Sequence, residues 1–195
     1  MNRQQSFTAA EAAIVTGLPV RAIQKAIDEG PLSRGRKRRA RVLSEPDLYY
    51  LVAIRGFDPG LVRLTSRAKD QLRRAMFTCW QSKRGGRNMA FAGLSIDVRV
   101  VAAQVHANLS KLERARRMVV RDAEIRGGEP VIRGTRIPVY LIADMLLQGA
   151  SEEEILSGYP TLKRENFDLA LIYSKAYPRR GRPPRHSWHV AGRAA

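Results

Sequence analysis

The chain has 195 residues, of which 35 are lysine or arginine and 18 are aspartate or glutamate, so its formal net charge is +17. With 44% hydrophobic residues it has the composition of a globular protein, and no apolar run approaches the roughly 18 residues of a membrane-spanning helix. The single cysteine, Cys79, excludes a disulfide framework, and the first twenty residues lack the apolar region of a secretory signal. We therefore expect a cytoplasmic protein with no membrane partner.

The positive charge is unevenly distributed along the chain. Residues 1–56 carry 10 basic and 5 acidic side chains, and residues 57–122 carry 14 and 5. Residues 123–176 carry 6 basic and 8 acidic side chains, whereas residues 177–195 carry 5 basic and none acidic. Because a basic surface attracts phosphate, this asymmetry predicts nucleic acid at the front of the chain and a different partner for the near-neutral region.

Residues 1–56 predict two short helices joined by a tight turn. Thr8 and Glu11 form a capping-box pattern that opens the first helix, and Gly17-Leu18-Pro19 ends it and starts a second one over about 20–29. The inner face of the first helix is expected to be Ala10, Ala13, Ile14 and Gly17. The second helix is expected to bury Ile23, Ala26 and Ile27. Its exposed face is expected to be Arg21, Gln24, Lys25 and Asp28.

A basic segment without acidic residues follows at 33–41. Its cations are Arg34, Arg36, Lys37, Arg38, Arg39 and Arg41. A short strand is expected at 42–43, and the residues 44–47 are expected to open a third helix. This order of elements is typical of a winged helix-turn-helix, and residues 7–55 resemble the MerR-type DNA-binding domain. The alternative for 33–41 is a solvated loop or a basic linker.

The two basic surfaces of this region are expected to play different roles in DNA binding. The cations of the segment 33–41 are expected to contact phosphates, which sets the register but carries no base specificity. Arg21, Gln24 and Lys25 on the second helix are the candidates for contacts with base edges.

The region 57–122 is expected to begin with a turn at 57–60, a strand at 61–64 and a helix from Thr65 to about Ser82. The inner face of this helix is expected to be Ala68, Leu72, Ala75 and Met76. The basic residues here are expected either to extend the phosphate-binding surface or to lie in solvent. They are Arg67, Lys69, Arg73, Arg74, Lys83, Arg84 and Arg87.

A long helix with an apolar stripe is expected to end the middle region. Residues 89–96 are predicted to be extended, and Asp97 is expected to cap a helix that runs through Met118. Its stripe has a spacing of three and four residues: Val98, Val101, Val105, Asn108, Leu112, Ala115 and Val119. This stripe favours a homodimer, because helix-turn-helix proteins commonly read two half-sites by two-fold symmetry. The alternative is that it packs on the chain's own middle strands.

Residues 123–176 predict a small β corner followed by three short helices. Residues 131–132 and 136–137 are expected to be extended around Gly134, at which a positive φ is expected. A helix is expected at 140–147, a second one after the capping box of Ser151 and Glu154, and a third at about 164–176. The last helix is expected to bury Phe167, Ala170, Leu171 and Ser174.

This region resembles the DUF433 family of antitoxins. The residues that carry the resemblance are Gly128, Pro130, Ile132, Gly134, Thr135, Arg136, Ile137, Val139, Tyr159, Pro160 and Leu162. The resemblance implies a three-helix, helix-turn-helix-like bundle that is encoded beside a PIN-like ribonuclease toxin. With the winged helix-turn-helix in front of this module, the whole chain resembles the longer VapB-type antitoxins.

No catalytic constellation, metal site or cofactor site is expected, so the chain is predicted not to be an enzyme. The glycines around 127–134 match neither the dinucleotide-binding nor the P-loop pattern. His106, His186 and His189 lack further ligands, and Glu152 to Glu154 begin a helix, where acidic residues stabilise the helix dipole. A nuclease or nucleotide-dependent enzyme that uses the glycine corner is the rival interpretation.

The tail 177–195 is rich in proline, arginine and aromatic residues and is expected to fold only on a partner. The centre of a PIN nuclease is a cluster of carboxylates that holds Mg²⁺, and arginine pairs with carboxylates bidentately. The expected toxin-binding residues are therefore Arg179, Arg180, Arg182, Arg185 and Trp188. The alternative is that the tail is a non-specific DNA-binding arm.

The predicted fold class is mainly α with small β elements. The expected parts are a winged helix-turn-helix in 1–56, a basic middle region with a dimerising helix in 57–122, a three-helix DUF433-type bundle in 123–176 and a basic tail in 177–195. The expected function is a type II antitoxin that neutralises a PIN-like (VapC-type) ribonuclease toxin and binds operator DNA to repress its own operon. The alternative is a stand-alone DNA-binding transcriptional regulator whose C-terminal module only dimerises or senses a signal.

Overall fold

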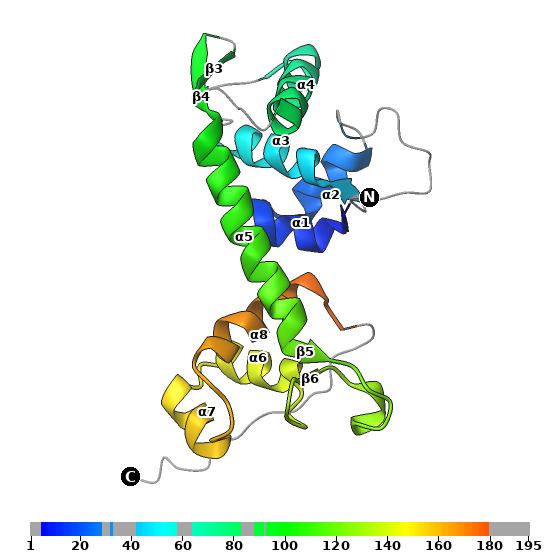
Figure 1. Cartoon of the computed structure of the whole chain (residues 1–195), viewed down its shortest axis with the longest axis vertical. Helices are drawn as coiled ribbons and strands as arrows, with labels where there is room; N and C mark the ends of the chain where they lie inside the picture. Colours follow the sequence, from blue (N-terminus) through cyan, green and yellow to red (C-terminus); the bar gives the residue numbers. More distant parts are fainter. Residues whose placement is uncertain are drawn as a thin grey trace. The chain divides into compact units, whose positions relative to one another are not determined.

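The computed structural model describes residues 5–28, 32, 42–57, 64–82, 88–91 and 93–179 (Figure 1). Over these residues the protein is mainly helical with short antiparallel strand pairs, which confirms that the fold is mainly α with small β elements. The chain divides into two compact units, residues 1–112 and residues 113–195. The expected strand at 61–64 lies almost wholly outside the described residues.

The first helix has the two ends that the sequence predicts. Helix α1 (Ala9–Thr16) begins at Thr8, whose amide donates to the Glu11 carboxylate at 2.8 Å, while the Glu11 amide donates to the Thr8 hydroxyl at 3.2 Å. It ends at Gly17, which adopts a φ of 70°. This left-handed conformation suits glycine because glycine has no Cβ.

A second helix and a short strand pair complete the N-terminal part of the first unit. Helix α2 (Val20–Asp28) buries Ile23 and Ile27, as predicted, whereas Ala26 is only half-buried. Strand β2 (Leu43–Ser44) pairs antiparallel with β1 (Ser6–Phe7). Strand β1 could not be predicted from the sequence, because two residues are too few to show the alternation that marks a strand.

The expected inner face of α1 was wrong. The expected residues Ala10, Ala13 and Ile14 are only half-buried, whereas the buried residues are Glu11, Ala12, Val15 and Thr16. The face that turns inward carries Val15 and Thr16, whose carbonyls accept from the side chains of Asn108 and Arg55. The Thr16 hydroxyl is satisfied there, because it donates to the Ala12 carbonyl at 2.7 Å.

Helix α3 (Glu45–Arg55) forms the centre of the first unit. It is buried from Pro46 to Ala53 and packs against both α1 and α4 (Figure 1). Helix α4 (Ser66–Ser82) starts after Thr65, whose hydroxyl accepts from the Ala68 amide at 3.2 Å. It buries Leu72 and Met76, so the predicted helix and the centre of its inner face are confirmed.

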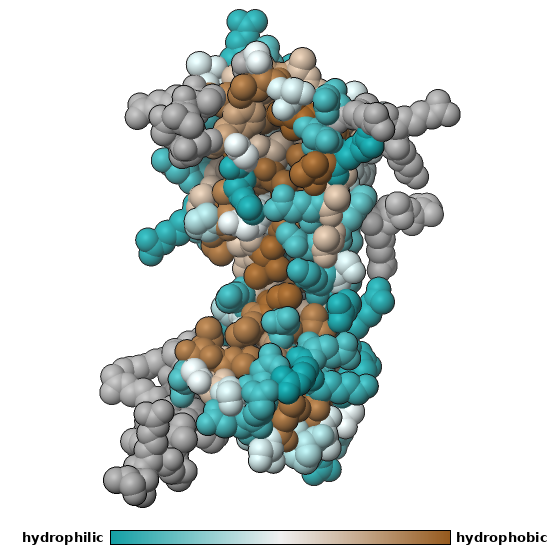
Figure 2. Space-filling model, turned by 90° about the vertical axis from the view of Figure 1, so that its left-hand side faces the viewer, coloured by the Kyte–Doolittle hydropathy of each residue, from teal (hydrophilic) through white to brown (hydrophobic). Residues whose placement is uncertain are grey.

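The segment predicted as extended folds back on itself. Strands β3 (Asn88–Phe91) and β4 (Leu94–Asp97) form an antiparallel hairpin that turns at Gly93, with a φ of 79°. Apolar side chains reach the surface at the level of this hairpin (Figure 2). Helix α5 (Val98–Met118) follows, and the Asp97 carboxylate accepts from the amides of Arg99 and Val100 at 2.9 Å and 3.4 Å, as predicted for a cap.

The stripe on α5 is covered within the chain and does not form an exposed seam. Val105 and Leu112 are fully buried, and Val98 and Val101 are 5% and 7% exposed. The Asn108 amide donates to the Val15 carbonyl at 2.8 Å, which joins α5 to α1. The stripe therefore packs on its own chain, and the bond from Asn108 shows that it packs partly against helix α1 rather than only against the middle strands.

The second unit is built from a strand pair and three helices around one core. Strand β5 (Val119–Val120) pairs antiparallel with β6 (Val131–Ile132), and a single 3₁₀ turn, η1 (Arg126–Gly128), lies between them. Helices α6 (Val139–Leu147), α7 (Glu152–Gly158) and α8 (Glu165–Ala176) follow. All three predicted helices are confirmed within one or two residues.

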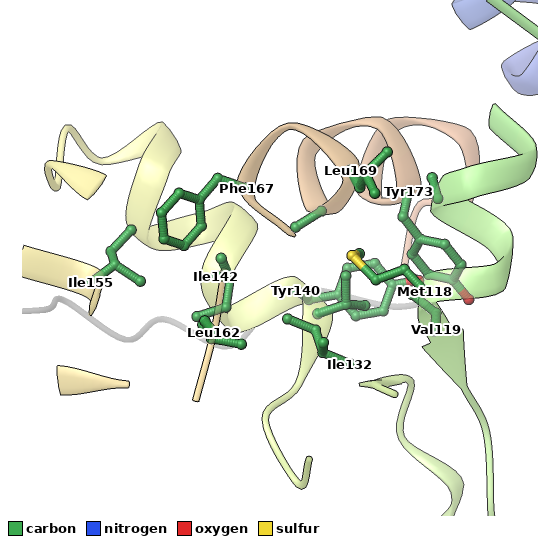
Figure 3. Packing of buried hydrophobic residues seen from close by; sticks show 13 residues of the cluster. Met118, Val119, Ile132, Tyr140, Ile142, Ile155, Leu162, Phe167, Leu169 and Tyr173 are labelled. Carbon is green, nitrogen blue, oxygen red and sulfur yellow. The ribbon is translucent and has the colours of Figure 1, made fainter. Parts of the chain in front are cut away.

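The core of the second unit lies between α6, α7, α8 and the strand pair (Figure 3). The predicted end of the long helix at Met118 is confirmed, and Val119, the last residue of the predicted stripe, belongs to β5. On α8, Leu169 and Tyr173 are buried, whereas the predicted Leu171 and Ser174 are only half-buried. The buried face is rotated toward Tyr173 because a tyrosine ring buries much more apolar area than a serine.

We predict that Gly17→Ala destabilises the first unit. An alanine would have to adopt a left-handed conformation and its Cβ would collide with the Arg55 guanidinium. The free energy of unfolding should fall by at least about 1–2 kcal/mol, measured by chemical denaturation. Gly158→Ala in α7 of the second unit is the control, since Gly158 has open space around it and no positive φ, and this substitution should leave stability unchanged or raise it slightly. Equal stability of both variants would contradict this account.

Candidate functional site

The exposed face of α2 carries the residues that the sequence predicts as base-contacting. Arg21, Gln24 and Lys25 are all exposed, while Ile23 and Ile27 are buried on the other side of the helix. Because residues three and four positions apart share a helix face, these three side chains lie together. Two cations beside an amide suit a surface that contacts phosphates and base edges.

The turn between α1 and α2 is held by a contact from a distant part of the chain. Arg55 Nη1 donates to the Thr16 carbonyl at 2.8 Å, and the Leu18 amide donates to the Thr16 hydroxyl at 3.3 Å. The last turn of α3 therefore fixes the corner that orients α2. The role of Arg55 could not be predicted from the sequence, because its partner lies 39 residues earlier in the chain.

A buried carboxylate joins α3 to α4 and removes one cation from the expected basic face. Asp47 is buried, and it accepts from the Ser44 amide at 2.9 Å and from the Ser44 hydroxyl at 2.6 Å. Arg73 pairs with the same carboxylate at 3.4 Å. The placement of Arg73 on the outer, phosphate-facing side of α4 was therefore wrong, whereas Arg67 and Arg74 are exposed.

The basic segment predicted as a wing lies outside the described residues. Its cations are Arg34, Arg36, Lys37, Arg38, Arg39 and Arg41, and their role in DNA binding stays a prediction. Near its two ends, Leu32 and Leu43 are fully or almost fully buried. Lys83, Arg84 and Arg87 also lie outside the described residues.

The residues of the glycine corner in the second unit mainly build the fold. Gly134 adopts a φ of 77°, and the Thr135 hydroxyl donates to the Ile132 carbonyl at 2.8 Å and accepts from the Ile137 amide at 3.0 Å. Pro130 and Val139 are buried.

The other motif residues divide between the core and the surface. Gly128 adopts a φ of 82°, Leu162 is buried and Tyr159 packs on the core. Arg136 and Pro160 are exposed.

A cluster of three tyrosines, Tyr140, Tyr173 and Tyr177, closes the C-terminal end of α8. Ring centroids lie 6.0 Å apart for Tyr140 and Tyr173, and 4.8 Å apart for Tyr173 and Tyr177. The Tyr140 hydroxyl donates to the Tyr177 carbonyl at 2.6 Å, and Arg116 Nε donates to the Tyr177 hydroxyl at 2.5 Å. The chain is therefore fastened to the module beyond the end of α8.

Arg179 is engaged by the module itself. Its guanidinium lies 4.6 Å from the centre of the Tyr140 ring and pairs with Asp144 Oδ2 at 3.1 Å. Of the expected toxin-binding residues, Arg180, Arg182, Arg185 and Trp188 lie outside the described residues. Arg179 is therefore the one whose surroundings are defined, and it contacts its own chain.

The electrostatics of the tyrosine cluster favour a structural role. Burial raises the pKa of Tyr140 above its usual value, so its hydroxyl stays protonated at neutral pH and donates its hydrogen bond. A hydrogen bond to the Tyr173 hydroxyl is the main cause that raises the pKa of Arg121. No proton is released near pH 7 by either of these groups.

The described residues offer little for metal or membrane chemistry. Within them, no group of three or more His, Cys, Asp or Glu side chains is arranged to hold a metal ion. None of their helices combines the length and apolar character needed to cross a bilayer.

Comparisons with known proteins place the second unit in a sequence family. The family described as "Protein of unknown function (DUF433)" matches residues 119–174. Over 186 residues the chain is 33% identical to "Uncharacterized protein y4eO" of Sinorhizobium fredii (strain NBRC 101917 / NGR234). The matched region covers 91% of this chain and 84% of that relative. No solved structure matches the chain.

We predict that Arg179→Ala destabilises the second unit, because it removes the contact with the Tyr140 ring and the pair with Asp144. Both side chains of the ion pair are partly exposed, so the free energy of unfolding should fall by only about 0.5–1.5 kcal/mol. Urea denaturation followed by circular dichroism measures it. Arg136→Ala, which changes an exposed arginine of the same unit, is the control. Indistinguishable stabilities would show that Arg179 is not anchored there.

Proposed function

The chain belongs to the family of the Sinorhizobium fredii protein y4eO and contains a DUF433 domain, and we propose that it is a DNA-binding antitoxin of a type II toxin–antitoxin system. In this proposal the first unit binds operator DNA as a winged helix-turn-helix and represses the operon. The C-terminal region binds and neutralises a PIN-like (VapC-type) ribonuclease. The protein acts in the cytoplasm as a binding protein, without an enzymatic activity of its own.

The observation that carries the DNA-binding part is the exposed face of α2. In a helix-turn-helix the second helix enters the major groove, where Arg or Lys contacts guanine and Gln contacts adenine. Arg21, Gln24 and Lys25 form such a face, and the clamp between Arg55 and Thr16 holds the helix that bears it.

The distribution of charge supports the same assignment. The net charge is +5 over residues 1–56 and +9 over 57–122, but −2 over 123–176. Attraction to phosphate is long-range and screened by salt, so DNA should be drawn to the front of the chain rather than to the DUF433 domain.

The toxin-binding part rests on the resemblance to DUF433 antitoxins and on the composition of the tail. Because Arg179 is held by Tyr140 and Asp144, we assign it the role of an anchor. The residues proposed to pair with the carboxylates of the nuclease are Arg180, Arg182 and Arg185, with Trp188 as the apolar contact.

We predict different effects of two substitutions on DNA binding. Gln24→Ala should reduce the preference for operator over random duplex by roughly 1–3 kcal/mol, because it removes a base contact. Arg39→Ala should weaken binding to both duplexes. The slope of the logarithm of affinity against the logarithm of salt concentration should become shallower by about 0.9, because one phosphate contact is lost. Gel-shift titrations at several salt concentrations measure both effects.

A matched control for these titrations is Arg136→Ala in the DUF433 domain, which should leave both affinities unchanged. If the purified chain fails to bind duplex DNA at low salt, the DNA-binding part is refuted. If Gln24→Ala weakens operator and random duplex equally, α2 does not read bases.

We predict that truncation after Arg179 abolishes neutralisation of a PIN-like toxin encoded beside this gene. Ending the chain at Arg179 keeps Tyr177 and Arg179 on the module, so the DUF433 domain should remain folded. Co-expression with the toxin measures growth rescue, and binding is measured with the purified pair. The truncated chain should still bind operator DNA.

Two outcomes of the co-expression would change the assignment. Full rescue by the truncated chain would refute the role of the tail and leave toxin binding to the module. If neither the full chain nor the truncated one rescues growth while both bind the operator, the protein is a stand-alone transcriptional regulator.

A further inference from the structure

The β3–β4 hairpin has an apolar face that the described part of the chain covers only in part. The register pairs Met89 with Ile96 and Phe91 with Leu94. Because cross-strand partners and alternate residues share a face, these four apolar side chains lie on one side of the hairpin. None of them is buried, and Leu94 is 46% exposed.

An isolated two-stranded hairpin is at best marginally stable in water, and it needs a further layer or strand to cover its apolar face. In the described part of the chain, the Phe91 ring packs edge-to-face on Phe57, with their centroids 6.0 Å apart. This contact fastens the hairpin near the end of α3 but leaves Leu94 in solvent. The rest of the described chain therefore covers this apolar face only in part.

The charge of the hairpin indicates which kind of partner covers this face. Residues 88–96 contain no charged side chain in a chain of net charge +17. Nucleic acid is drawn to cations, which this face does not offer. Two copies of a strongly basic chain repel each other, so they can meet most readily at a surface that is apolar and uncharged.

We propose that the β3–β4 hairpin is the surface at which two copies of this chain associate. The contact is isologous: the apolar face of one hairpin covers that of the partner, so that Leu94 of each copy lies in the interface. The α5 stripe cannot serve instead, because Val101, Val105 and Leu112 are already covered. The biological need for two copies rests on the proposed function, in which two helices read two half-sites.

The test is the mass of the full chain in the absence of DNA, measured by sedimentation equilibrium across a wide range of concentrations. The wild type should be dimeric, and Leu94→Asp should raise the dimer dissociation constant at least about tenfold, because it places two like charges in the contact. Leu147→Asp is the control: Leu147 is 66% exposed in the second unit, and its substitution should leave the dimer intact.

Hydrogen exchange gives an independent readout that does not depend on how the variant folds. In the wild type, the hairpin amides should be more protected at high protein concentration than at low concentration. A monomeric wild type, concentration-independent exchange, or a Leu94→Asp chain that dimerises like the wild type would overturn the proposal. Since no DNA is present, none of these results decides whether the chain binds an operator.

Discussion

The left-handed backbone at Gly17 is the constraint on which the candidate DNA-binding face depends. It allows α2 to start with only three residues between it and the end of α1. Ile23 and Ile27 then pack inward while Arg21, Gln24 and Lys25 point out. The conformation is reinforced from outside, because the Arg55 guanidinium occupies the space that a Cβ would need and bonds the Thr16 carbonyl. The Arg55 cation thus helps to orient the exposed cations of α2.

The helix boundaries were predictable from the sequence because their signals are local. The capping pairs Thr8 with Glu11 and Ser151 with Glu154 lie three residues apart, and both are present in the structure. Asp97 likewise begins α5 where the sequence places it. Such signals depend only on residues that are neighbours along the chain, so no knowledge of the tertiary structure is needed to interpret them.

The errors have the opposite origin, because they concern contacts between distant residues. The face of α8 was assigned by spacing alone, but Tyr173 is buried because its ring meets Tyr140 and Tyr177 across the module. Arg73 has the sequence context of a solvent-facing cation, yet its partner Asp47 lies 26 residues earlier. For the candidate site, the exposed face of α2 was predictable, whereas the Arg55 clamp and the anchoring of Arg179 were not.

The position of the DUF433 motif in the structure limits what the family resemblance can say about a partner. Most motif side chains are used within the module: Pro130, Ile132 and Val139 are buried, and the Thr135 hydroxyl bonds the Ile132 carbonyl. The motif therefore reports how the module folds. Recognition of a second protein requires side chains that remain available at the surface. The acidic start of α7 is already paired, since Arg164 bridges Glu152 and Glu153 at 2.9 Å and 2.7 Å.

A near-neutral module whose surface charges are partly paired with one another attracts a partner only weakly over long distances. Specific binding by the C-terminal region must then come from short-range contacts. The tyrosine cluster and Arg179 contribute to this by fixing the point from which the basic tail departs, next to Asp144 on α6. Anchoring the base of a binding segment lowers the entropy that is lost when the rest of it is ordered on a partner. Under the proposed function, selectivity for one toxin therefore resides in the tail rather than in the motif that identifies the family.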